Sequence, residues 1–123
     1  MGKNILIIED NEQNLYLVTF ILEKSGHRVF QARSGDEGVR TASVCEPDLI
    51  LLDIQLPVMD GYTVARELRK IPALAAIPII AVTSFAMPGD REQALAAGCT
   101  GYIEKPIDPD TFITQINQHL PPH

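Results

Sequence analysis

Short runs of apolar residues recur along the chain, and each run ends at a polar residue. The clearest runs cover residues 5–8, 49–52, 79–82 and 102–103. A continuous apolar run of this length is typical of a strand buried on both faces of a parallel sheet, although periodicity alone leaves a buried helical segment open. Because the carboxyl ends of parallel strands line one crevice, the polar residues after the runs are expected to meet there. They are Glu9, Asp10, Asp53, Thr83 and Lys105.

The segment after the first run has helical periodicity. Leu15, Val18 and Leu22 recur at helical spacing, and Gly26 follows as a plausible helix end. A short second strand is expected at residues 29–30, where two apolar residues follow this glycine. The first strand, helix and second strand thus form one alternating unit.

Helix boundary residues mark the other connections. The sequence Ser-Gly-Asp-Glu at 34–37 has the form of a capping box, and this helix should end before Pro47. We expect a further helix from Asp60-Gly61 to near Pro72, followed by a strand over about 77–82. An alanine-rich helix over about 90–97 and a strand over about 101–104 should come next. Asp108 should cap a last helix, whose buried residues are Phe112, Ile113, Ile116 and Leu120.

The resulting five strand–helix units predict an α/β fold. Alternating units with apolar strands imply a doubly wound parallel sheet between two layers of helices, because such crossovers are right-handed. In the flavodoxin-like (βα)5 arrangement, with strand order 2-1-3-4-5, the topological switch lies between strands one and three. The chain of 123 residues suits one domain, and we expect a single domain over residues 1–123 with no output domain.

Composition and charge limit the classes of partner. The net charge of -6 and the lack of a Lys/Arg cluster argue against direct nucleic-acid binding, and the expected partner is a protein. No apolar stretch reaches the roughly 18 residues of a membrane span, and the N-terminus does not resemble a signal peptide. Cys45 and Cys99 show no metal-ligand spacing, so buried reduced thiols are expected. These observations favour a cytoplasmic protein without membrane contact.

Three carboxylates at the topological switch point predict a cation-binding site. Glu9, Asp10 and Asp53 would repel one another unless a positive group joined them. A divalent ion such as Mg²⁺ prefers oxygen ligands of this kind. Glu9 and Asp10 have a second interpretation, because acidic residues at a helix start also serve as caps.

The same residues favour phosphoryl chemistry. The three histidines lie elsewhere in the sequence, so an acid–base mechanism that uses histidine has no candidate. A carboxylate can instead act as a nucleophile towards phosphorus, with cations neutralising the phosphoryl oxygens. In this interpretation Asp53 attacks, Asp10 and Glu9 hold the metal, Lys105 offsets the phosphoryl charge and the Thr83 hydroxyl binds one oxygen.

Four motifs resemble those of a known family. Together, in this order and spacing, they resemble the signature of the response-regulator receiver domain of two-component signalling, and the similarity spans Lys3 to about Leu120. The motifs are Ile-Ile-Glu-Asp-Asn at 7–11, Leu-Leu-Asp-Ile-Gln-Leu-Pro-Val-Met-Asp-Gly at 51–61, Ala-Val-Thr at 81–83 and Tyr-Ile-Glu-Lys-Pro at 102–106.

The resemblance implies a phosphorelay function. Asp53 would take a phosphoryl group from the phosphohistidine of a histidine kinase or phosphotransfer protein, so the chain would act as a signalling protein whose only reactions are its own phosphorylation and dephosphorylation. Asp10, Asp53 and the backbone carbonyl of Gln55 would bind Mg²⁺, with Glu9 reaching the ion through water. The peptide bond before Pro106 would be cis.

The resemblance also implies a switch. Thr83 would move toward the phosphoryl group and Tyr102 would turn inward behind it, changing a protein-binding face over about residues 90–120. Phe85 and Met87 would suit a contact with a downstream protein, although they could equally pack inward. Tyr16 and Thr19 of the first helix lie on the expected kinase-docking face, and the sequence leaves the cognate kinase open.

Other functions are weaker candidates. A flavodoxin-like redox carrier would have a phosphate-binding loop after the first strand, and this chain has no such loop. An Asp-nucleophile phosphohydrolase would have a second Asp at the position of Gln55. A receiver of a hybrid histidine kinase is a closer alternative. The motifs are most similar to those of stand-alone receivers that regulate cell division, and we expect a monomer or weak dimer.

Overall fold

The apolar runs form the strands of one parallel sheet. The computed structural model describes residues 2–84 and 88–120. All adjacent strands are parallel, and their order is β2-β1-β3-β4-β5, so the expected flavodoxin-like fold is confirmed. The strands are β1 (Asn4–Ile8), β2 (Arg28–Ala32), β3 (Leu49–Asp53), β4 (Ile79–Thr83) and β5 (Gly101–Glu104).

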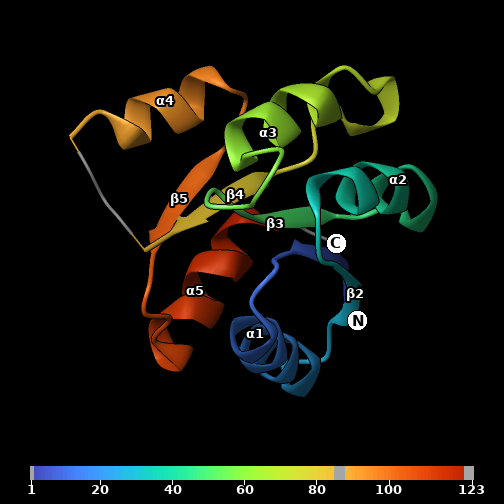
Figure 1. Ribbon diagram of the computed structural model, residues 1–123. Coiled ribbons are helices and arrows are strands. Elements are labelled where there is room, and N and C mark those ends of the chain that lie inside the picture. Colours follow the sequence, from blue (N-terminus) through green and yellow to red (C-terminus); the bar gives the residue numbers. More distant parts are fainter. Residues whose placement is uncertain (1, 85–87, 121–123) are drawn as a thin grey trace.

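Helices cover both faces of this sheet. Figure 1 shows α1 and α5 on one face and α2, α3 and α4 on the other, which gives the three layers expected from right-handed crossovers. The helices are α1 (Glu12–Lys24), α2 (Gly35–Cys45), α3 (Gly61–Arg69), α4 (Asp90–Ala96) and α5 (Pro109–His119), with a short 3-10 turn, η1 (Pro72–Leu74), after α3.

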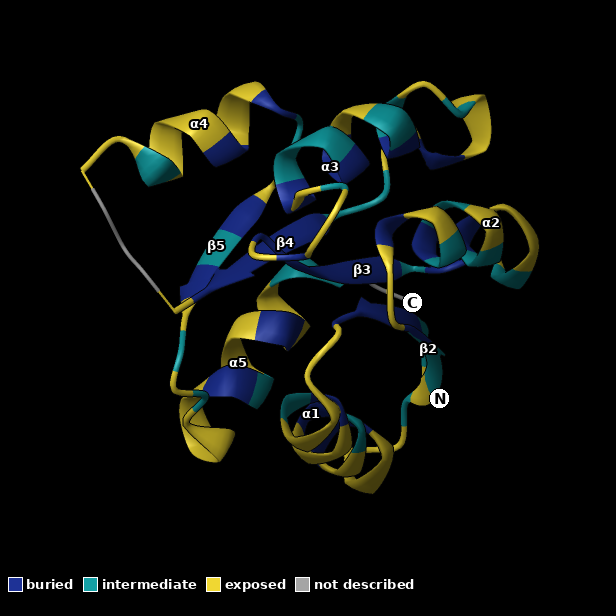
Figure 2. Cartoon of the chain, viewed as in Figure 1, coloured by how far each residue is buried: buried dark blue, intermediate teal, exposed yellow. Residues whose placement is uncertain are grey.

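The hydrophobic core is divided by the sheet into two clusters. Successive side chains of a strand point to opposite faces, so Ile5 and Ile7 of β1 join the cluster under α1 and α5. Leu6 and Ile8 join the cluster under α2, α3 and α4. The central strands appear buried along their length in Figure 2. Burial on both faces explains why the sequence shows continuous apolar runs without alternation.

Side chains cap the helix starts. The Asp60 carboxylate accepts the N–H of Thr63 at 2.9 Å, as expected for the start of α3. Ser34 accepts the N–H of Glu37 at 3.2 Å, which confirms half of the capping box. The other half is wrong, because the Glu37 carboxylate accepts the N–H of Arg33 at 2.7 Å. A glutamate at this position is long enough to reach one residue beyond the cap.

Prolines mark the boundaries of one helix and one strand, and the two cysteines differ in burial. The helix before Pro47 ends at Cys45, as expected, whereas β4 begins at Ile79 because Pro78 has no N–H to donate. Both cysteines are free, but only Cys99 is fully buried, so the prediction of two buried thiols is wrong for Cys45. Burial raises the pKa of the Cys99 thiol to about 11.

Within residues 2–84 and 88–120, every helix is too short or too polar to cross a bilayer.

Candidate functional site

The sheet register brings the polar strand ends together. Glu9 lies one position beyond the last pair between β1 and β3, beside Asp53. Thr83 lies one position past the β4 partner of Asp53, and Lys105 follows the β5 residue that pairs with Thr83. These side chains come from four strand ends, yet parallel pairing places them around one crevice.

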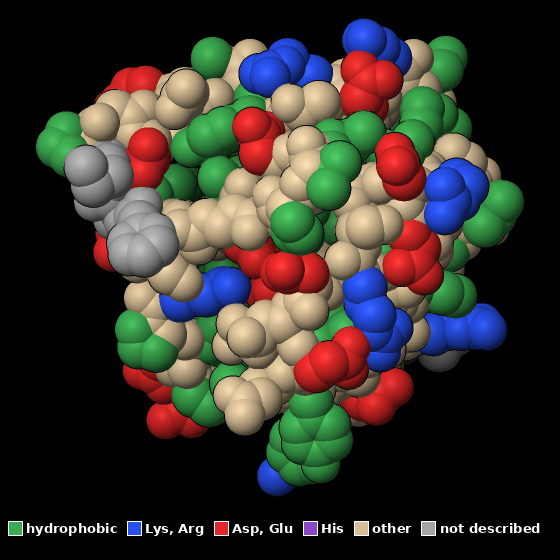
Figure 3. Space-filling model, viewed as in Figure 1, with side chains coloured by type: hydrophobic (Ala, Val, Ile, Leu, Met, Phe, Trp, Pro, Cys, Tyr) green, Lys and Arg blue, Asp and Glu red, His purple; other side chains and the backbone are tan. Residues whose placement is uncertain are grey.

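Three carboxylates form the centre of this crevice. One oxygen each from Glu9, Asp10 and Asp53 lies within 4.8 Å of the others, with Glu9 and Asp53 buried and Asp10 exposed. Figure 3 shows Asp and Glu side chains gathered near the middle of the face in view, beside a Lys or Arg side chain. The donor set consists of hard oxygen ligands that are partly open to solvent, which fits a divalent cation such as Mg²⁺.

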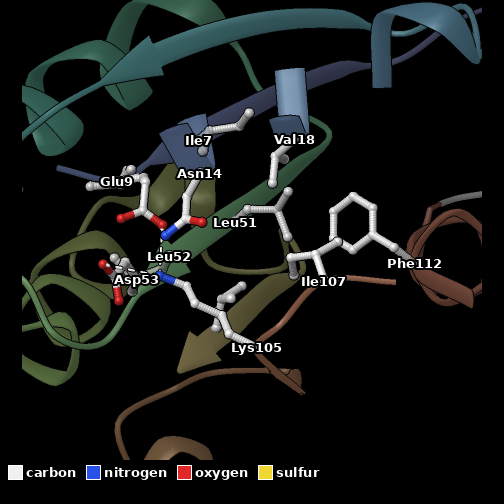
Figure 4. A pocket seen from close by; sticks show the side chains of 12 residues that line it. Ile7, Glu9, Asn14, Val18, Leu51, Leu52, Asp53, Lys105, Ile107 and Phe112 are labelled. Atoms are coloured by element: carbon white, nitrogen blue, oxygen red, sulfur yellow. Dashed lines mark hydrogen bonds and ion pairs between the residues drawn. The ribbon is translucent and has the colours of Figure 1, made fainter. Parts of the chain in front are cut away.

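Lys105 supplies a positive charge inside the cluster. Its Nζ lies 3.0 Å from Glu9 Oε1 and 3.7 Å from Asp53 Oδ2. Only 12% of the Lys105 side chain is exposed, so its ammonium is directed into the crevice (Figure 4). The bond between Lys105 and Pro106 is cis, as expected. One ammonium thus pairs with two of the three clustered carboxylates.

The pKa of Glu9 is raised in this buried, negatively charged cluster. The pKa of the Glu9 carboxyl is raised to about 7, chiefly by burial and next by its hydrogen bond with the Asp53 carboxylate, while Lys105 acts in the opposite direction. Glu9 Oε2 also accepts the N–H of Asn11 at 3.2 Å. A cation beside this carboxylate would favour its ionised form, so metal binding and proton release from Glu9 are coupled.

The loop after β3 fixes the orientation of Asp53. The N–H of Gln55 donates to Asp53 Oδ1 at 3.0 Å, which leaves Oδ2 on the side of Lys105. Gly61 packs directly beneath this loop, where an added Cβ would lie 2.5 Å from the Ile54 Cα. Any side chain at Gly61 would therefore push α3 away from Asp53.

Gln55 makes a contact that the sequence did not predict. Its side chain is exposed, and its Oε1 accepts the backbone N–H of Ser84 at 3.1 Å. The two loops that border the crevice, after β3 and after β4, are joined by this bond. The expected role of the Gln55 backbone carbonyl as a metal ligand stays a prediction.

The proposed switch residues occupy different environments. Thr83 is buried at the end of β4, close to the crevice. Tyr102 is half-buried, and its hydroxyl is buried without a hydrogen-bond partner among the described residues. Burial raises the pKa of the Tyr102 phenol. Phe85 and Met87, the expected partner-binding residues, lie outside the described residues.

Sequence reasoning missed one residue that lines the crevice. Asn14 borders the same pocket as Glu9, Asp53 and Lys105 (Figure 4). The sequence places Asn14 on the inward face of the first helix, because it lies four residues before the inward-facing Val18. A polar residue on the apolar stripe of the first helix was the signal that could have identified it.

The outer face of α1 is partly apolar. Tyr16 and Phe20 are 73% and 54% exposed, and hydrophobic side chains protrude over α1 in Figure 3. Thr19 does not share this exposure, since it is half-buried and its Oγ1 accepts the side-chain N–H of Gln31 at 2.9 Å. The place of Thr19 in the expected docking face stays a prediction, and its hydroxyl has a partner from β2.

Comparisons with curated proteins give a consistent result. The model of the response regulator receiver domain family matches residues 5–117. The polar-differentiation response regulator DivK of Brucella ovis is 45% identical over 120 residues, covering 98% of both chains. DivK of Brucella anthropi is 44% identical over the same share of each chain.

Solved structures show the same similarity. The receiver domain of a sensor histidine kinase from Pseudomonas aeruginosa, crystallised with a magnesium ion in its active-site cleft, is 37% identical with a TM-score of 0.89, covering 97% of this chain and 98% of that one. The chemotaxis protein CheY4 of Vibrio cholerae is 26% identical with a TM-score of 0.94, covering 98% and 100%. The chain therefore belongs to the response regulator receiver domain family of two-component signalling.

Proposed function

We propose that this chain is a phosphorylation switch in which Asp53 accepts a phosphoryl group from a histidine kinase or histidine phosphotransfer protein. The observation that carries the proposal is the setting of Asp53, buried at a strand end, with one oxygen held by Gln55 and the other 3.7 Å from Lys105. In the reaction, Asp53 Oδ2 forms a bond to phosphorus while the nitrogen–phosphorus bond of the phosphohistidine breaks. The chain is thus a signalling protein and not an enzyme that turns over a metabolite.

The carboxylate cluster would hold Mg²⁺. Asp10, Asp53 and the backbone carbonyl of Gln55 are the expected ligands, and Glu9 would contact the ion through water. When bound, the ion neutralises charge on the phosphoryl oxygens. Support comes from the geometry of the cluster and from the magnesium ion in the related kinase receiver. Lys105, which now contacts Glu9, would then be available to the phosphoryl group.

Phosphorylation would change the face formed by α4, β5 and α5. A new dianion at Asp53 attracts the Thr83 hydroxyl, and Tyr102 turns into the space that Thr83 leaves. The buried Tyr102 hydroxyl without a partner supports this step, because an unsatisfied buried group favours a rearrangement that gives it one. A downstream protein would read the altered face, and Phe85 and Met87 remain candidate contacts.

The pattern of relatives supports a stand-alone receiver similar to DivK. The match covers 98% of DivK as well as 98% of this chain. We propose a monomer or weak dimer in the cytoplasm, phosphorylated by a histidine kinase through the exposed apolar part of α1.

Incubation with Mg²⁺ and a small phosphodonor tests the proposal. Intact-mass analysis should show one phosphoryl group on the protein and none on Asp53→Asn, which keeps the fold because the two side chains have the same shape. Asp36→Asn is the matched control, since Asp36 is exposed on α2, and it should be modified normally. Equal modification of Asp53→Asn would overturn the assignment of the phosphoacceptor.

A further inference from the structure

We propose that the Gln55 side chain is a displaceable cap on the backbone N–H of Ser84, and that it competes with the phosphoryl group for this donor. The inference rests on the proposed function, because it assigns a regulating role within the same site. It starts from the 3.1 Å hydrogen bond between Gln55 Oε1 and Ser84 N. This bond joins residues 29 positions apart and crosses the mouth of the crevice.

The Ser84 N–H is directed toward β3 by the pleat of β4. The carbonyl of Val82 accepts the N–H of Ile54, the residue after β3, and the next carbonyl, of Thr83, accepts the N–H of Lys105 on the opposite side. Successive backbone groups of a strand alternate between neighbours. The N–H of Ser84 therefore points back to the β3 side, beside Asp53, where a strand partner is replaced by the Gln55 side chain.

Three donors around Asp53 are occupied in this structure. The Gln55 N–H donates to Asp53 Oδ1 at 3.0 Å, Lys105 Nζ donates to Glu9 at 3.0 Å, and the Ser84 N–H donates to the Gln55 side chain. A phosphoryl group on Asp53 brings three terminal oxygens that need donors of this kind. It can obtain the Ser84 N–H only if the Gln55 amide leaves.

The Gln55 amide is the acceptor that can leave at low cost. Glu9 and Asp53 are buried at the strand ends, whereas Gln55 is exposed and can rotate into solvent. The exchange replaces a neutral hydrogen bond of Ser84 with a charge-assisted one. In the unmodified protein the cap therefore ties the loop after β4 to the loop after β3, and phosphorylation releases that tie.

Beryllofluoride, a phosphoryl analogue, provides the test with the full chain and saturating Mg²⁺. Gln55→Met has a side chain of similar length without an amide oxygen, so beryllofluoride should bind about three- to tenfold more tightly, the effect of one lost competing hydrogen bond. Gln55→Asn keeps the amide but is one methylene too short to reach Ser84, and it should behave like Gln55→Met. Gln13→Met makes the same change at an exposed position of α1 and should leave the affinity unchanged.

Amide hydrogen exchange at Ser84 supplies a readout that general stability would not change. In the free protein this amide should exchange severalfold faster in both Gln55 variants than in the wild type. With beryllofluoride bound, the three proteins should exchange at the same rate. Unchanged affinity, or unchanged exchange at Ser84, would overturn the role of Gln55 while leaving the proposed function intact. Failure of the wild type to bind beryllofluoride would overturn the proposed function and this inference with it.

Discussion

The two ends of the sheet use charged side chains in opposite ways. Near the amino ends of β4 and β5, the Arg69 guanidinium donates to the carbonyls of Gly98, Leu74 and Ile77 at 2.9, 2.8 and 2.7 Å. At the carboxyl ends, three carboxylates cluster and one ammonium pairs with two of them. The acceptors around Arg69 are neutral groups of connecting segments, backbone carbonyls and the Thr100 hydroxyl, so the charge gains hydrogen bonds without meeting a like charge.

The difference shows where stability and function are located. Around Arg69, loops that would otherwise leave carbonyls unpaired are joined into a rigid base. Around Asp53, repulsion among carboxylates opposes folding and is relieved by a cation or by protonation. The chain therefore concentrates stabilising contacts at the end of the sheet that carries no chemistry, as expected if a site designed for ligand binding lowers stability.

Breaking the contacts of Arg69 should have the largest effect. Arg69→Met leaves at least three carbonyls without their donor, so we expect a loss of about 3 kcal/mol in the free energy of unfolding. Urea unfolding followed by circular dichroism measures it. Arg66→Met, an exposed position of the same helix, should change stability by less than about 0.5 kcal/mol. Similar losses in both variants would contradict the role of Arg69 as an anchor.

Stability should depend on pH through Glu9. Because the pKa of Glu9 is raised from 4.5 to about 7, the folded protein binds a proton more tightly than the unfolded chain between these values. The contribution of this group is therefore present below pH 4.5 and is lost as pH rises through 7, by at most about 3 kcal/mol. The measurement is urea unfolding across this range without divalent cations.

Glu9→Gln provides the control for that measurement. The difference in unfolding free energy between wild type and Glu9→Gln should change by about the same amount between pH 4.5 and 7.5. Saturating Mg²⁺ should reduce the change, because the cation favours the ionised carboxylate. A difference that stays constant with pH would show that Glu9 has an ordinary acidity.

Removal of the nucleophile should stabilise the protein. Asp53→Asn removes one of the repelling carboxylates while keeping an acceptor for the Gln55 N–H, so we expect a gain of about 1 kcal/mol at neutral pH without cations. The gain should disappear at saturating Mg²⁺, which stabilises the wild type by binding. Destabilisation in both conditions would mean that the attraction between Asp53 and Lys105 outweighs the repulsion.

Relief of backbone strain in the loop after β3 should have the smallest effect on stability. Val58 is fully exposed at a φ of 68°, a left-handed conformation that is costly for a β-branched residue. Val58→Asn should therefore raise stability by about 0.5–1 kcal/mol in thermal unfolding. Val44→Asn, at an exposed helical position, is the control and should give no gain. Equal effects at both positions would remove backbone strain as the explanation.

Much of the architecture could be predicted from local patterns. The buried runs identified the central strands, and Pro47, Asp60 and Asp108 marked helix boundaries through local backbone chemistry. The weaker predictions concerned side chains whose partners come from distant segments. The hydrogen bond from Gln31 of β2 to the Thr19 hydroxyl is an example, because nothing local in the sequence shows that the two residues lie side by side.

The candidate site shows the same division. Its carboxylates, hydroxyl and ammonium could be predicted as a group, because each follows a buried strand and parallel strands end at one edge. Asn14 was missed because its entry into the crevice depends on how α1 packs. The Gln55 cap was missed because it joins two loops whose separation no periodic pattern specifies.

The sequence by itself determined the order of the elements, the class of fold and the set of residues available for phosphoryl chemistry, since burial patterns and strand ends are encoded locally. Only the tertiary structure decided how these residues interact. The distance from Lys105 to each carboxylate, the raised pKa of Glu9 and the bond between Gln55 and Ser84 all depend on contacts between segments far apart in the chain. Electrostatic and hydrogen-bond energies vary steeply with distance and burial, which the order of residues alone does not specify.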